Sequence, residues 1–288
     1  MTGIDSFAPT YDTLGRRALT ASFTEAPGFE LVEGNLNNID LGPFVAESDV
    51  VFHLAARPGV RASWRDFAQV VDANILATQR ILDSVAEHPH ARLVFASSSS
   101  VYGDLAEEPA IEEQRLSPIS PYGVSKASCE ALLAAYASQY QLCVTSLRFF
   151  TVYGPRQRTD MAFTRWIRSA ALGEPLVIYG DGSAVRDFTF VADVVDAARL
   201  AVEVTTAGHH IYNVAGGSPA SVKEVIELLP SLVGRDVEVV NVESAKGDPR
   251  RTAADTSKLR KDLGWTPKWS LVDGLSAQVS WWLERSKS

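Results

Sequence analysis

Tyr122 and Lys126 stand four residues apart at the start of an apolar stretch of helical period that continues to Tyr140. On a helix, two residues at this spacing lie on one face, one turn apart. A free tyrosine has a pKa near ~10 and is a poor base at neutral pH, but an adjacent lysine ammonium favours the phenolate and lowers that pKa. Lowering the tyrosine pKa to ~7 takes about 4 kcal/mol of stabilisation of the phenolate, which one lysine and a cationic cofactor ring could supply. The pair therefore indicates a base for a hydroxyl proton, although any amphipathic helix can bring such a pair together by chance.

Four consecutive serines follow a short apolar run at 93–96, which has the composition of a buried strand. They are Ser97, Ser98, Ser99 and Ser100. Open α/β sheets bind ligands at the carboxyl ends of their strands. Together with the tyrosine and the lysine, these hydroxyls indicate a site that handles the proton of a substrate hydroxyl. Taken alone, the serines also fit a polar exit from strand to loop.

Apolar runs of strand length alternate with helical patterns through the first half of the chain. The runs cover 2–4, 29–32, 49–54, 93–96 and 143–149, and the helical patterns cover 67–87 and 122–140. This alternation predicts a parallel sheet with helices on its faces, the doubly wound α/β class. The final third is less regular, and we interpret Trp265, Trp269, Trp281 and Trp282 there as packing residues.

The composition is that of a globular chain without a basic surface. Its 288 residues are 46% hydrophobic and 22% charged, which fits one large domain or two intimate ones. A net charge of -8 disfavours nucleic-acid binding. With neither a charged-then-apolar leader nor an apolar run of ~18 residues, we expect a cytoplasmic protein that spans no membrane.

The cysteines and histidines show no pattern typical of a metal site. Cys129 and Cys143 lack the paired spacing of a disulfide or zinc site, so we expect both to be reduced, buried thiols. We interpret His209 and His210 as exposed loop residues. We therefore expect no bound metal.

Further motifs follow these signals in a fixed order. They are Gly3-Ile4-Asp5, His53-Leu54-Ala55-Ala56, Asn74, Arg148-Phe149-Phe150-Thr151-Val152-Tyr153-Gly154-Pro155, Tyr179-Gly180-Asp181-Gly182, Arg186-Asp187-Phe188 and Gly247-Asp248-Pro249-Arg250-Arg251-Thr252. In this order, and over almost the whole chain, the sequence resembles the extended short-chain dehydrogenase/reductases, in the branch of nucleotide-sugar epimerases and dehydratases. The resemblance implies NAD as the cofactor and a UDP-sugar as the substrate.

The same resemblance implies two interleaved domains. A Rossmann-type domain that binds NAD would cover 1–155 and about 187–216. A smaller α/β domain that binds the nucleotide sugar would cover 156–186 and 217–288. A homodimer formed through the helices at 67–87 and 122–140 is also implied.

The beginning of the chain departs from the family. In a Rossmann unit a glycine-rich turn follows the first strand, and an acidic residue for the ribose comes roughly 20 residues later. Asp5 resembles that acidic residue, with four residues in front of it. We therefore expect the first strand, the glycine turn and the first helix to be missing, about 30 residues of a βαβ unit.

Two hypotheses account for this beginning. Met1 stands where the family usually has an apolar residue, so a valine codon misread as an initiator would place the natural start upstream. An upstream reading frame without a glycine-rich strand-turn-helix would exclude that hypothesis. The alternative is a real truncation that binds little cofactor.

The resemblance also assigns contacts with the cofactor. Asp5 would accept from the adenine-side ribose hydroxyls, which favours NAD over NADP because a 2'-phosphate would meet a carboxylate. Asn35 and Leu36 would hold the adenine. His53 and Asn74 are equally well explained as polar residues satisfied in the core. The other implied contacts come from Leu54, Ala55, Ala56, Asn74, Ser97, Tyr122 and Lys126.

The implied chemistry is a transient oxidation at C4 of the sugar. Tyr122 as phenolate would take the 4-hydroxyl proton while the C4 hydride passes to NAD, and Lys126 would hold the tyrosine pKa and the nicotinamide ribose. Ser98 would hydrogen-bond the 4-oxygen, with Ser99 as its rival. The 4-keto sugar would then turn over and take the hydride back on its other face.

The residues around the serine loop bear on the identity of the sugar. Related dehydratases carry an acidic pair where Ser99 and Ser100 stand, so elimination is disfavoured. The run from Arg148 to Ala162 is most similar to UDP-glucuronate 4-epimerases, whereas UDP-glucose epimerases more often carry Asn in place of Thr151. Thr151, Ser99 and Ser100 would then bind the C6 carboxylate of the sugar.

Arginines are implied for the UDP moiety, because the planar guanidinium suits phosphate recognition. They are Arg158, Arg186 and Arg250, with Arg251 as a rival of Arg250. Other functions remain open: a UDP-glucose 4-epimerase or a decarboxylase on the same scaffold, or a non-catalytic relic that binds nucleotide sugars.

Overall fold

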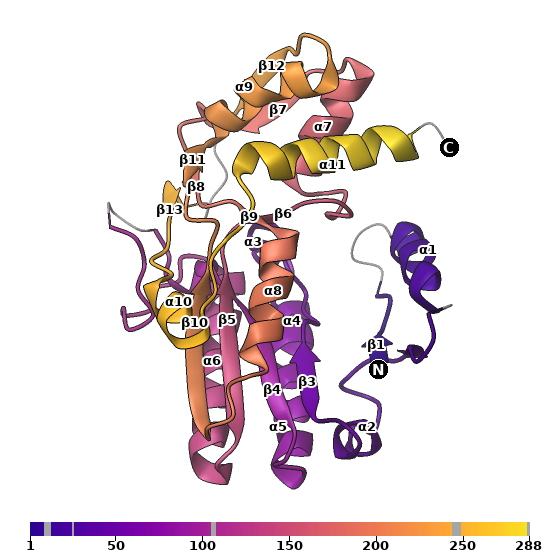
Figure 1. Cartoon of the computed structure of the whole chain (residues 1–288), viewed down its shortest axis with the longest axis vertical. Helices are drawn as coiled ribbons and strands as arrows, with labels where there is room; N and C mark the ends of the chain where they lie inside the picture. The colour runs from indigo at the N-terminus through magenta and orange to yellow at the C-terminus, as the bar shows by residue number, and fades with distance from the viewer. Residues whose placement is uncertain (9–12, 25, 105–107, 244–248, 287–288) are drawn as a thin grey trace.

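The structure is a computed structural model that describes residues 1–8, 13–24, 26–104, 108–243 and 249–286. Gly247 and Asp248, which belong to the last sequence motif, lie outside these ranges. Figure 1 shows a main sheet in the lower part of the molecule, a smaller α/β part above it, and the N-terminal elements at one side.

The main sheet has four strands in the order β10-β5-β4-β3, and all three pairings are parallel. Its strands are β3 (Val50–His53), β4 (Arg92–Ser98), β5 (Cys143–Phe149) and β10 (Gly208–Val214). His209 and His210 lie on β10, so the prediction that they are loop residues is wrong. The strand forms by pairing with β5, a partner distant in sequence that a local pattern does not reveal.

Helices cover both faces of the main sheet, which confirms the doubly wound class. On one face, α5 (Ala77–Glu87) and α6 (Pro121–Tyr140) pack with Leu93 and Phe95 of β4. On the other face, α8 (Val191–Ala201) and α10 (Ser257–Leu263) pack with Val94. Successive side chains of β4 therefore point to opposite faces of the sheet and pack in two different cores. This alternation is expected of a strand that is covered on both faces.

The N-terminal unit is a separate two-stranded parallel sheet with its crossover helix. It consists of β1 (Thr2–Asp5), α1 (Thr13–Thr24) and β2 (Glu30–Glu33). Both strands lie within one residue of the predicted runs. Phe7 is the single buried residue from 1 to 40 among those whose burial the structure describes. A short helix, α2 (Gly42–Ala46), then leads to β3.

The helix predicted at 67–87 is divided into three parts. After a first turn α3 (Val60–Ser63), the chain forms α4 (Phe67–Val70), a π-helical turn η1 (Val71–Leu76) and α5. The π-helical turn packs against α6. Such turns occur frequently at functional sites, where they change the direction of a side chain.

The smaller part of the molecule has an aromatic core of its own. The ring centroids of Tyr153 and Phe163 are 5.0 Å apart, and those of Phe163 and Phe188 are 4.9 Å apart. The surrounding elements are α7 (Ala162–Leu172), β7 (Leu176–Tyr179), α9 (Val222–Val233), β12 (Val239–Val242) and α11 (Leu271–Arg285). Short strands join it to the main sheet: β6 (Val152–Tyr153), β8 (Val185–Arg186), β9 (Thr189–Phe190), β11 (Ala220–Ser221) and β13 (Arg251–Thr252).

Side chains from each of the two predicted domains pack in the core of the other. Leu259 and Trp265, from the segment 217–288, pack against the main sheet, and Phe188, from the segment 187–216, packs in the smaller core. The domain assignment made from sequence stays a prediction. Within the described residues, no helix has both the length and the apolar character needed to cross a membrane.

Candidate active site

The first turn of α6 brings Tyr122 against the serine loop. Ser120 caps the helix, because its Oγ accepts the Gly123 N–H at 3.1 Å. A Cβ on Gly123 would lie 2.4 Å from the Ser100 carbonyl oxygen, so the two segments can approach only because this residue is glycine. The Tyr122 N–H donates to Ser63 Oγ at 3.1 Å, which anchors the turn on α3.

The serine loop begins at the carboxyl end of β4 with the 3-10 turn η2 (Ser99–Val101). Ser98 Oγ accepts the Ser100 N–H at 3.2 Å and donates to Ser100 Oγ at 3.1 Å. Ser97 differs, because its side chain is buried and donates to the Glu130 carboxylate. The structure therefore directs Ser97 into the core, while Ser98, Ser99 and Ser100 are half-buried at the end of the sheet.

Lys126 is 2% exposed and lies under the serine loop. Its Nζ donates to the Ala96 carbonyl at 2.7 Å and lies 4.5 Å from the centroid of the Phe95 ring. Burial lowers the pKa of Lys126 to about 8, against the opposing effects of Cys129 and Glu130. The lysine can therefore exchange a proton close to neutral pH.

The protein's own groups do not produce a low pKa at Tyr122. Burial raises the pKa of this phenol, while its hydrogen bond with Ser98 and the charge of Arg158 act to lower it. From the sequence we predict that the Lys126 ammonium lowers the pKa of Tyr122, but in the structure that ammonium donates to the Ala96 carbonyl of β4. A cationic ring bound beside the phenol would still act in the expected direction.

A buried polar network supports the site from behind, and sequence reasoning missed it. Arg148 donates to Glu130 through Nε at 3.0 Å and Nη2 at 2.6 Å, and through Nη1 to Tyr102 Oη at 2.7 Å. Tyr102 in turn donates to Asn213 Oδ1 at 2.7 Å, and the Asn213 N–H donates to Glu112. Burial works to lower the pKa of Arg148, but the hydrogen bonds and charge of Glu130 outweigh it and raise that pKa.

The members of this network are far apart in sequence, so no motif marks them. Glu130 and Arg148 are 18 residues apart, and Tyr102 and Asn213 are 111 apart. The signal that could have found them is chemical: charged residues inside apolar elements need partners when they are buried. Through Ser97, the network fixes the end of β4 at the serine loop.

His53 and Asn74 serve the interior of the protein. His53 Nε2 lies 2.9 Å from Thr78 Oγ1, and burial, with the charge of Lys126, lowers the pKa of His53 to about 3. Asn74 donates to Ser125 Oγ at 2.9 Å and accepts the Arg57 N–H at 2.7 Å. From its π-helical turn, Asn74 thus ties the loop after β3 to α6.

The residues predicted for the adenine side lie on and after the N-terminal strands. Asp5 accepts the Phe7 N–H at 2.7 Å and Arg16 Nη2 at 2.8 Å, and its side chain is 44% exposed. Asn35 forms a local turn by accepting the Asn37 N–H at 3.0 Å. Leu36 packs on the core beneath α5 and α6.

The loop after β3 presents apolar groups to solvent. Leu54 is 62% exposed, Ala55 is exposed and Ala56 is half-buried. They follow the carboxyl end of β3, beside the serine loop at the end of β4. An exposed apolar surface at this end of the sheet fits the face of an aromatic ring.

Thr151 and Arg158 follow β5 and face the same end of the sheet. Thr151 is half-buried, and its carbonyl accepts the Thr189 N–H at 3.0 Å. Arg158 binds Asp160 with two hydrogen bonds of 3.0 and 2.6 Å, and its charge reaches Tyr122. The structure therefore places Arg158 near the tyrosine.

The remaining predicted arginines lie on the side of the smaller part. Arg186 donates from Nη1 to the Val185 carbonyl at 2.8 Å. Arg250 is bound to Asp104 at 3.1 Å, and its side chain is 88% exposed. Arg251, the rival, is half-buried, and its Nε has no partner among the described residues.

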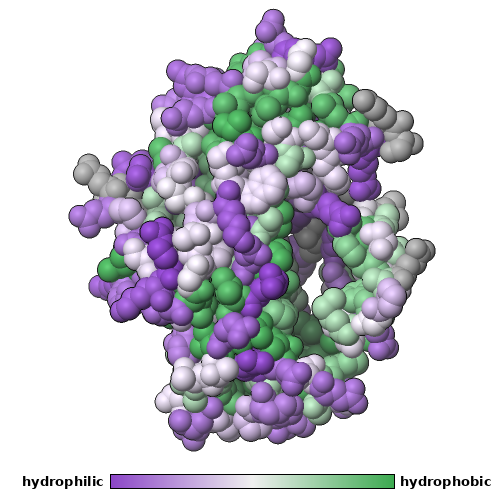
Figure 2. Space-filling view, viewed as in Figure 1, coloured by the Kyte–Doolittle hydropathy of each residue, from purple (hydrophilic) through white to green (hydrophobic). Residues whose placement is uncertain are grey.

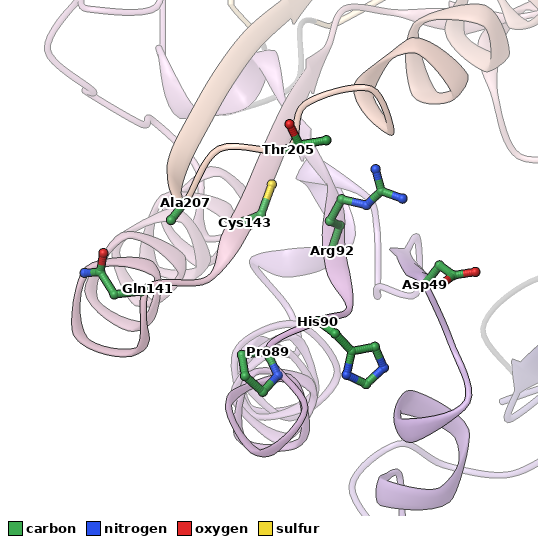
Figure 3. Close-up of a pocket in the computed structure, with 8 residues that line it drawn as sticks. All are labelled: Asp49, Pro89, His90, Arg92, Gln141, Cys143, Thr205 and Ala207. Carbon is green, nitrogen blue, oxygen red and sulfur yellow. The ribbon is translucent and has the colours of Figure 1, made fainter.

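A hollow of about 310 Å³ lies at the opposite end of the main sheet. Figure 3 shows Arg92 and Cys143 beside it, and these residues begin β4 and β5. Arg92 donates to the Val202 carbonyl at 2.6 Å, and the Cys143 thiol to the Val204 carbonyl at 3.2 Å. The hollow is therefore separate from the site of Tyr122, which lies where β4 ends.

Comparisons with known proteins agree on one family. The family model described as the NAD dependent epimerase/dehydratase family matches residues 5–215. A protein of Bacillus subtilis described as an uncharacterized UDP-glucose epimerase is 40% identical, over 97% of this chain and 88% of its own length. A UDP-glucuronate 4-epimerase of Thermodesulfobacterium geofontis is 33% identical, over 97% of this chain and 87% of its own length.

Among solved structures, this fold is similar to a UDP-glucuronic acid 4-epimerase from Bacillus cereus in complex with UDP-glucuronic acid and NAD. The TM-score is 0.94 at 36% identity, and the match covers 99% of this chain and 91% of that chain.

Proposed function

Because the chain belongs to the NAD-dependent epimerase/dehydratase family, we propose that it epimerises C4 of a UDP-sugar, most directly UDP-glucuronate to UDP-galacturonate. The observation that carries this proposal is the meeting of Tyr122 with Ser98 at the carboxyl end of β4. Lys126 lies one helical turn beyond Tyr122, buried under the same loop. This arrangement can accept and return the proton of a sugar hydroxyl.

NAD, when bound, accepts the C4 hydride of the sugar and returns it to the opposite face. In our proposal, Tyr122 as phenolate accepts the proton of the 4-hydroxyl, and Ser98 donates a hydrogen bond to the same oxygen. Lys126, with a pKa of about 8, would hold the nicotinamide ribose, and the cationic ring of the bound cofactor would favour the phenolate. Because the hydride is returned, the reaction needs no other redox partner.

The residues of this chain fit the two ends of NAD better than the pyrophosphate between them. Exposed Leu54 and Ala55 offer an apolar face for the nicotinamide, and Asp5 offers a carboxylate for the adenine-side ribose. Asn35 and Leu36 follow β2, beside Asp5 in the parallel pair. The 288 residues contain no Gly-x-Gly-x-x-Gly spacing, so the usual backbone donors for the pyrophosphate are not among them.

Epimerisation is favoured over elimination, because no carboxylate of the serine loop can serve as an acid or base. Ser99 and Ser100 occupy the positions that follow Ser98. The buried carboxylates behind the loop already have hydrogen-bond partners. Glu130 binds Arg148 and Ser97, and Glu112 accepts the Asn213 N–H at 2.8 Å. Removal of water from the sugar would need a free acid there.

A uronate is the sugar that the charges favour. Arg158 acts on Tyr122 by its charge, so it lies close to where C4 and C6 of the sugar would sit. The sequence assigned Arg158 to the UDP moiety, but because its charge acts on Tyr122 we propose instead that it faces the C6 carboxylate, together with Thr151, Ser99 and Ser100. Arg186 and either Arg250 or Arg251 would then hold the UDP phosphates and ribose.

Product analysis on the purified chain tests this proposal. UDP-glucuronate and UDP-glucose are incubated separately with NAD, the nucleotide sugars are separated by chromatography, and carbon dioxide release is measured. We expect UDP-galacturonate and no carbon dioxide. Epimerisation of UDP-glucose alone would favour the UDP-glucose epimerase, a UDP-pentose with carbon dioxide would favour the decarboxylase, and nucleotide-sugar binding without turnover would favour the relic.

A pair of arginine variants tests the carboxylate contact. Arg158→Ala is expected to lower kcat/KM for UDP-glucuronate at least about 100-fold, because a charge-assisted contact with the carboxylate is lost. Arg168→Ala, on the exposed side of α7, is the control, since Arg168 is 59% exposed. Equal losses on UDP-glucuronate and UDP-glucose would show that Arg158 does not recognise the carboxylate.

A homodimer through the two long helices stays part of the proposal. Phe67 and Leu76 are 43% and 47% exposed on the first of these helical stretches, and Val124 and Tyr140 are 41% and 51% exposed on α6. Apolar groups on two adjacent helices fit a surface that is covered in an oligomer. Sedimentation of the purified chain would measure its state directly.

A cytoplasmic location is likewise proposed. It is supported by the two free cysteines, Cys129 and Cys143, because thiols remain reduced in that compartment. Cys129 is buried as predicted, whereas Cys143 is half-buried.

A further inference from the structure

The loop that carries Arg158 connects β6 with α7 and runs from Gly154 to Met161. Its backbone is unusual at two positions, because φ is 142° at Gly154 and 68° at Arg156. Positive φ values are uncommon for residues with a side chain, and such a conformation persists only where surrounding contacts hold it. The loop therefore depends on the elements that pack against it.

Helix α11 reaches the start of this loop with one face. Gly274 and Gln278 are four residues apart on α11, so they lie one turn apart on the same side. A Cβ on Gly274 would lie 2.3 Å from Tyr153 Oη, so the missing side chain lets Tyr153 approach the helix. The Tyr153 hydroxyl donates to the carbonyl of Ser270, the N-cap of α11, at 3.3 Å. The end of β6 is thus packed directly on α11.

The side chain of Gln278 binds the loop itself. It is 2% exposed, and its Oε1 accepts the Gly154 N–H at 3.0 Å. Its Nε2 lies 3.3 Å from Gln157 Oε1 and 3.5 Å from Thr164 Oγ1, and donates toward both. Gly154 is buried, so its N–H would be left without a partner if the Gln278 amide were removed.

Gln157 joins the loop to three elements at once. Its Nε2 donates to the Val152 carbonyl of β6 at 3.0 Å, and its Oε1 accepts the Thr164 N–H of α7 at 3.2 Å. Its Oε1 also faces the Gln278 amide of α11. Because Gln157 directly precedes Arg158, these bonds fix the backbone from which the arginine extends.

The N-terminal unit supports the same loop more loosely. The Arg156 guanidinium lies 5.1 Å from the centroid of the Phe23 ring, and Phe23 is 42% exposed. Exposed contacts of this kind are weak. Figure 2 shows an opening through the molecule between the N-terminal unit and the main sheet. The buried hydrogen bonds from α7 and α11 are therefore the firmer support of the loop.

We propose that Gln278 is a positioning residue, which holds the loop 154–161 so that Arg158 faces the sugar; this inference rests on the proposed function. Burying an amide is unfavourable unless its groups are hydrogen-bonded, and Gln278 finds those partners in the loop and in α7. Gln278 acts through Arg158 and does not itself touch the sugar. Its loss should therefore weaken recognition of the carboxylate more than the chemical step.

Variants at position 278 test the proposal by kinetics. Gln278→Met lacks the amide, so KM for UDP-glucuronate should rise at least about tenfold and kcat should change less than about twofold, because the carboxylate does not react. KM for UDP-glucose, which has no carboxylate, should change less. Gln278→Glu should keep KM within about threefold of the original, because burial favours a protonated carboxyl that offers both an acceptor and a donor.

A neighbour on the same helix supplies the matched control. Val279 is 2% exposed in the aromatic core of the smaller part, and Val279→Ala removes packing but no hydrogen bond to the loop. Its KM for UDP-glucuronate should be unchanged. An equal rise of KM in Val279→Ala and Gln278→Met would overturn the proposal, because weaker packing of α11 alone would then explain the effect.

A double-mutant cycle with Arg158→Ala separates positioning from a merely structural role. If Gln278 acts through Arg158, adding Gln278→Met to Arg158→Ala should change kcat/KM for UDP-glucuronate less than about twofold. Losses that multiply in the double variant would show that Gln278 does not act through Arg158 and would overturn the proposal.

Amide exchange distinguishes failure of this proposal from failure of the proposed function, because it requires neither NAD nor sugar. In peptides that cover 154–161, Gln278→Met should accelerate exchange at least about tenfold, while exchange in β5 stays the same. Faster exchange in a chain that turns over no UDP-sugar would contradict the proposed function alone, and the cycle is then measured on the Kd for UDP-glucuronate. Unchanged exchange in 154–161 would exclude the role of Gln278, whether or not the chain is active.

Discussion

Strand β5 has five consecutive buried residues, whereas strand β1 has none. Both belong to parallel pairs with a crossover helix, but β5 has a neighbour on each side and helices on both faces. β1 is paired with β2, and Phe7 is the one buried residue of the N-terminal unit among those whose burial the structure describes. A parallel strand therefore becomes part of a core only when the strands and helices around it are complete.

The ion pairs of the two regions differ in the same way. Arg148 and Glu130 behind the site are 3% and 4% exposed, and further hydrogen bonds satisfy both. Arg17 and Glu33 in the N-terminal unit are 46% and 54% exposed. Removing one partner should lower the free energy of unfolding in the first region, where the remaining charge would be buried away from water. It should not do so in the second region, where the remaining charge stays in water.

The largest expected effect is on catalysis. Tyr122→Phe should lower the rate of UDP-glucuronate epimerisation about 1,000-fold, because the proton acceptor is removed while the ring still packs. Its urea unfolding midpoint should be unchanged. Tyr140→Phe, at the other end of α6 and 51% exposed, is the control. A Tyr122→Phe enzyme with more than a tenth of the original rate would show that another group accepts the proton.

The next effect is on stability and compares the two ion pairs. Glu130→Ala should lower the free energy of unfolding by about 3–5 kcal/mol, because the Arg148 guanidinium is left buried without its partner. Glu33→Ala should leave the unfolding midpoint unchanged, since Arg17 remains in water. Urea titrations of both variants measure the difference. Equal losses in the two variants would contradict the contrast between the regions.

A pH-dependent effect should appear at Lys126. Burial lowers the pKa of Lys126 to about 8 in the folded protein, while an unfolded lysine titrates near ~10.4. Between these values the unfolded chain holds a proton that the folded chain has released, so this lysine makes stability rise with pH from about 8 to 10, by on the order of 2 kcal/mol.

Lys126→Met removes this contribution. Relative to the variant, the original protein should gain free energy of unfolding between pH 8 and pH 10, and the difference between the two should be constant below about pH 7. Urea titrations at each pH measure it. A difference that does not vary with pH would show that the buried ammonium is not desolvated.

The smallest effect is local. Phe7→Ala removes the buried ring of the N-terminal unit, over which the guanidinium of Arg17 lies at 4.3 Å. Amide exchange in β1 and β2 should become at least about tenfold faster, while exchange in β5 stays the same, because the unit can open without the main core. If exchange in β5 also accelerated, the two regions would unfold together.

Several features could be predicted from the sequence because they depend on near neighbours in the chain. β5 has the predicted bounds, and α6 begins one residue before the predicted start at Tyr122. Helical spacing puts Tyr122 and Lys126 on one helix, and Ser98 at the end of an apolar run leads to the carboxyl edge of a sheet. The family and the cofactor followed from motifs of this kind and are confirmed.

Other features could not be predicted, since they depend on which segments meet. The pairing of Glu130 with Arg148 and the placement of His210 on β10 join residues with no shared local pattern. The π-helical turn at Asn74 interrupts what the sequence reads as one helix. Its side chain finds partners in Arg57 and Ser125, which only the folded chain brings near.

The types and spacing of Tyr122, Lys126 and Ser98 were thus enough to indicate proton chemistry on a hydroxyl, because side-chain reactivity and helical period are local properties. The protonation of those groups was decided by the tertiary structure. Lys126 turns to the Ala96 carbonyl, and burial raises the pKa of Tyr122, since desolvation depends on everything packed around a group. The separation of β1 from the main sheet has the same origin, because whether a strand has a neighbour is a property of the sheet and not of the strand.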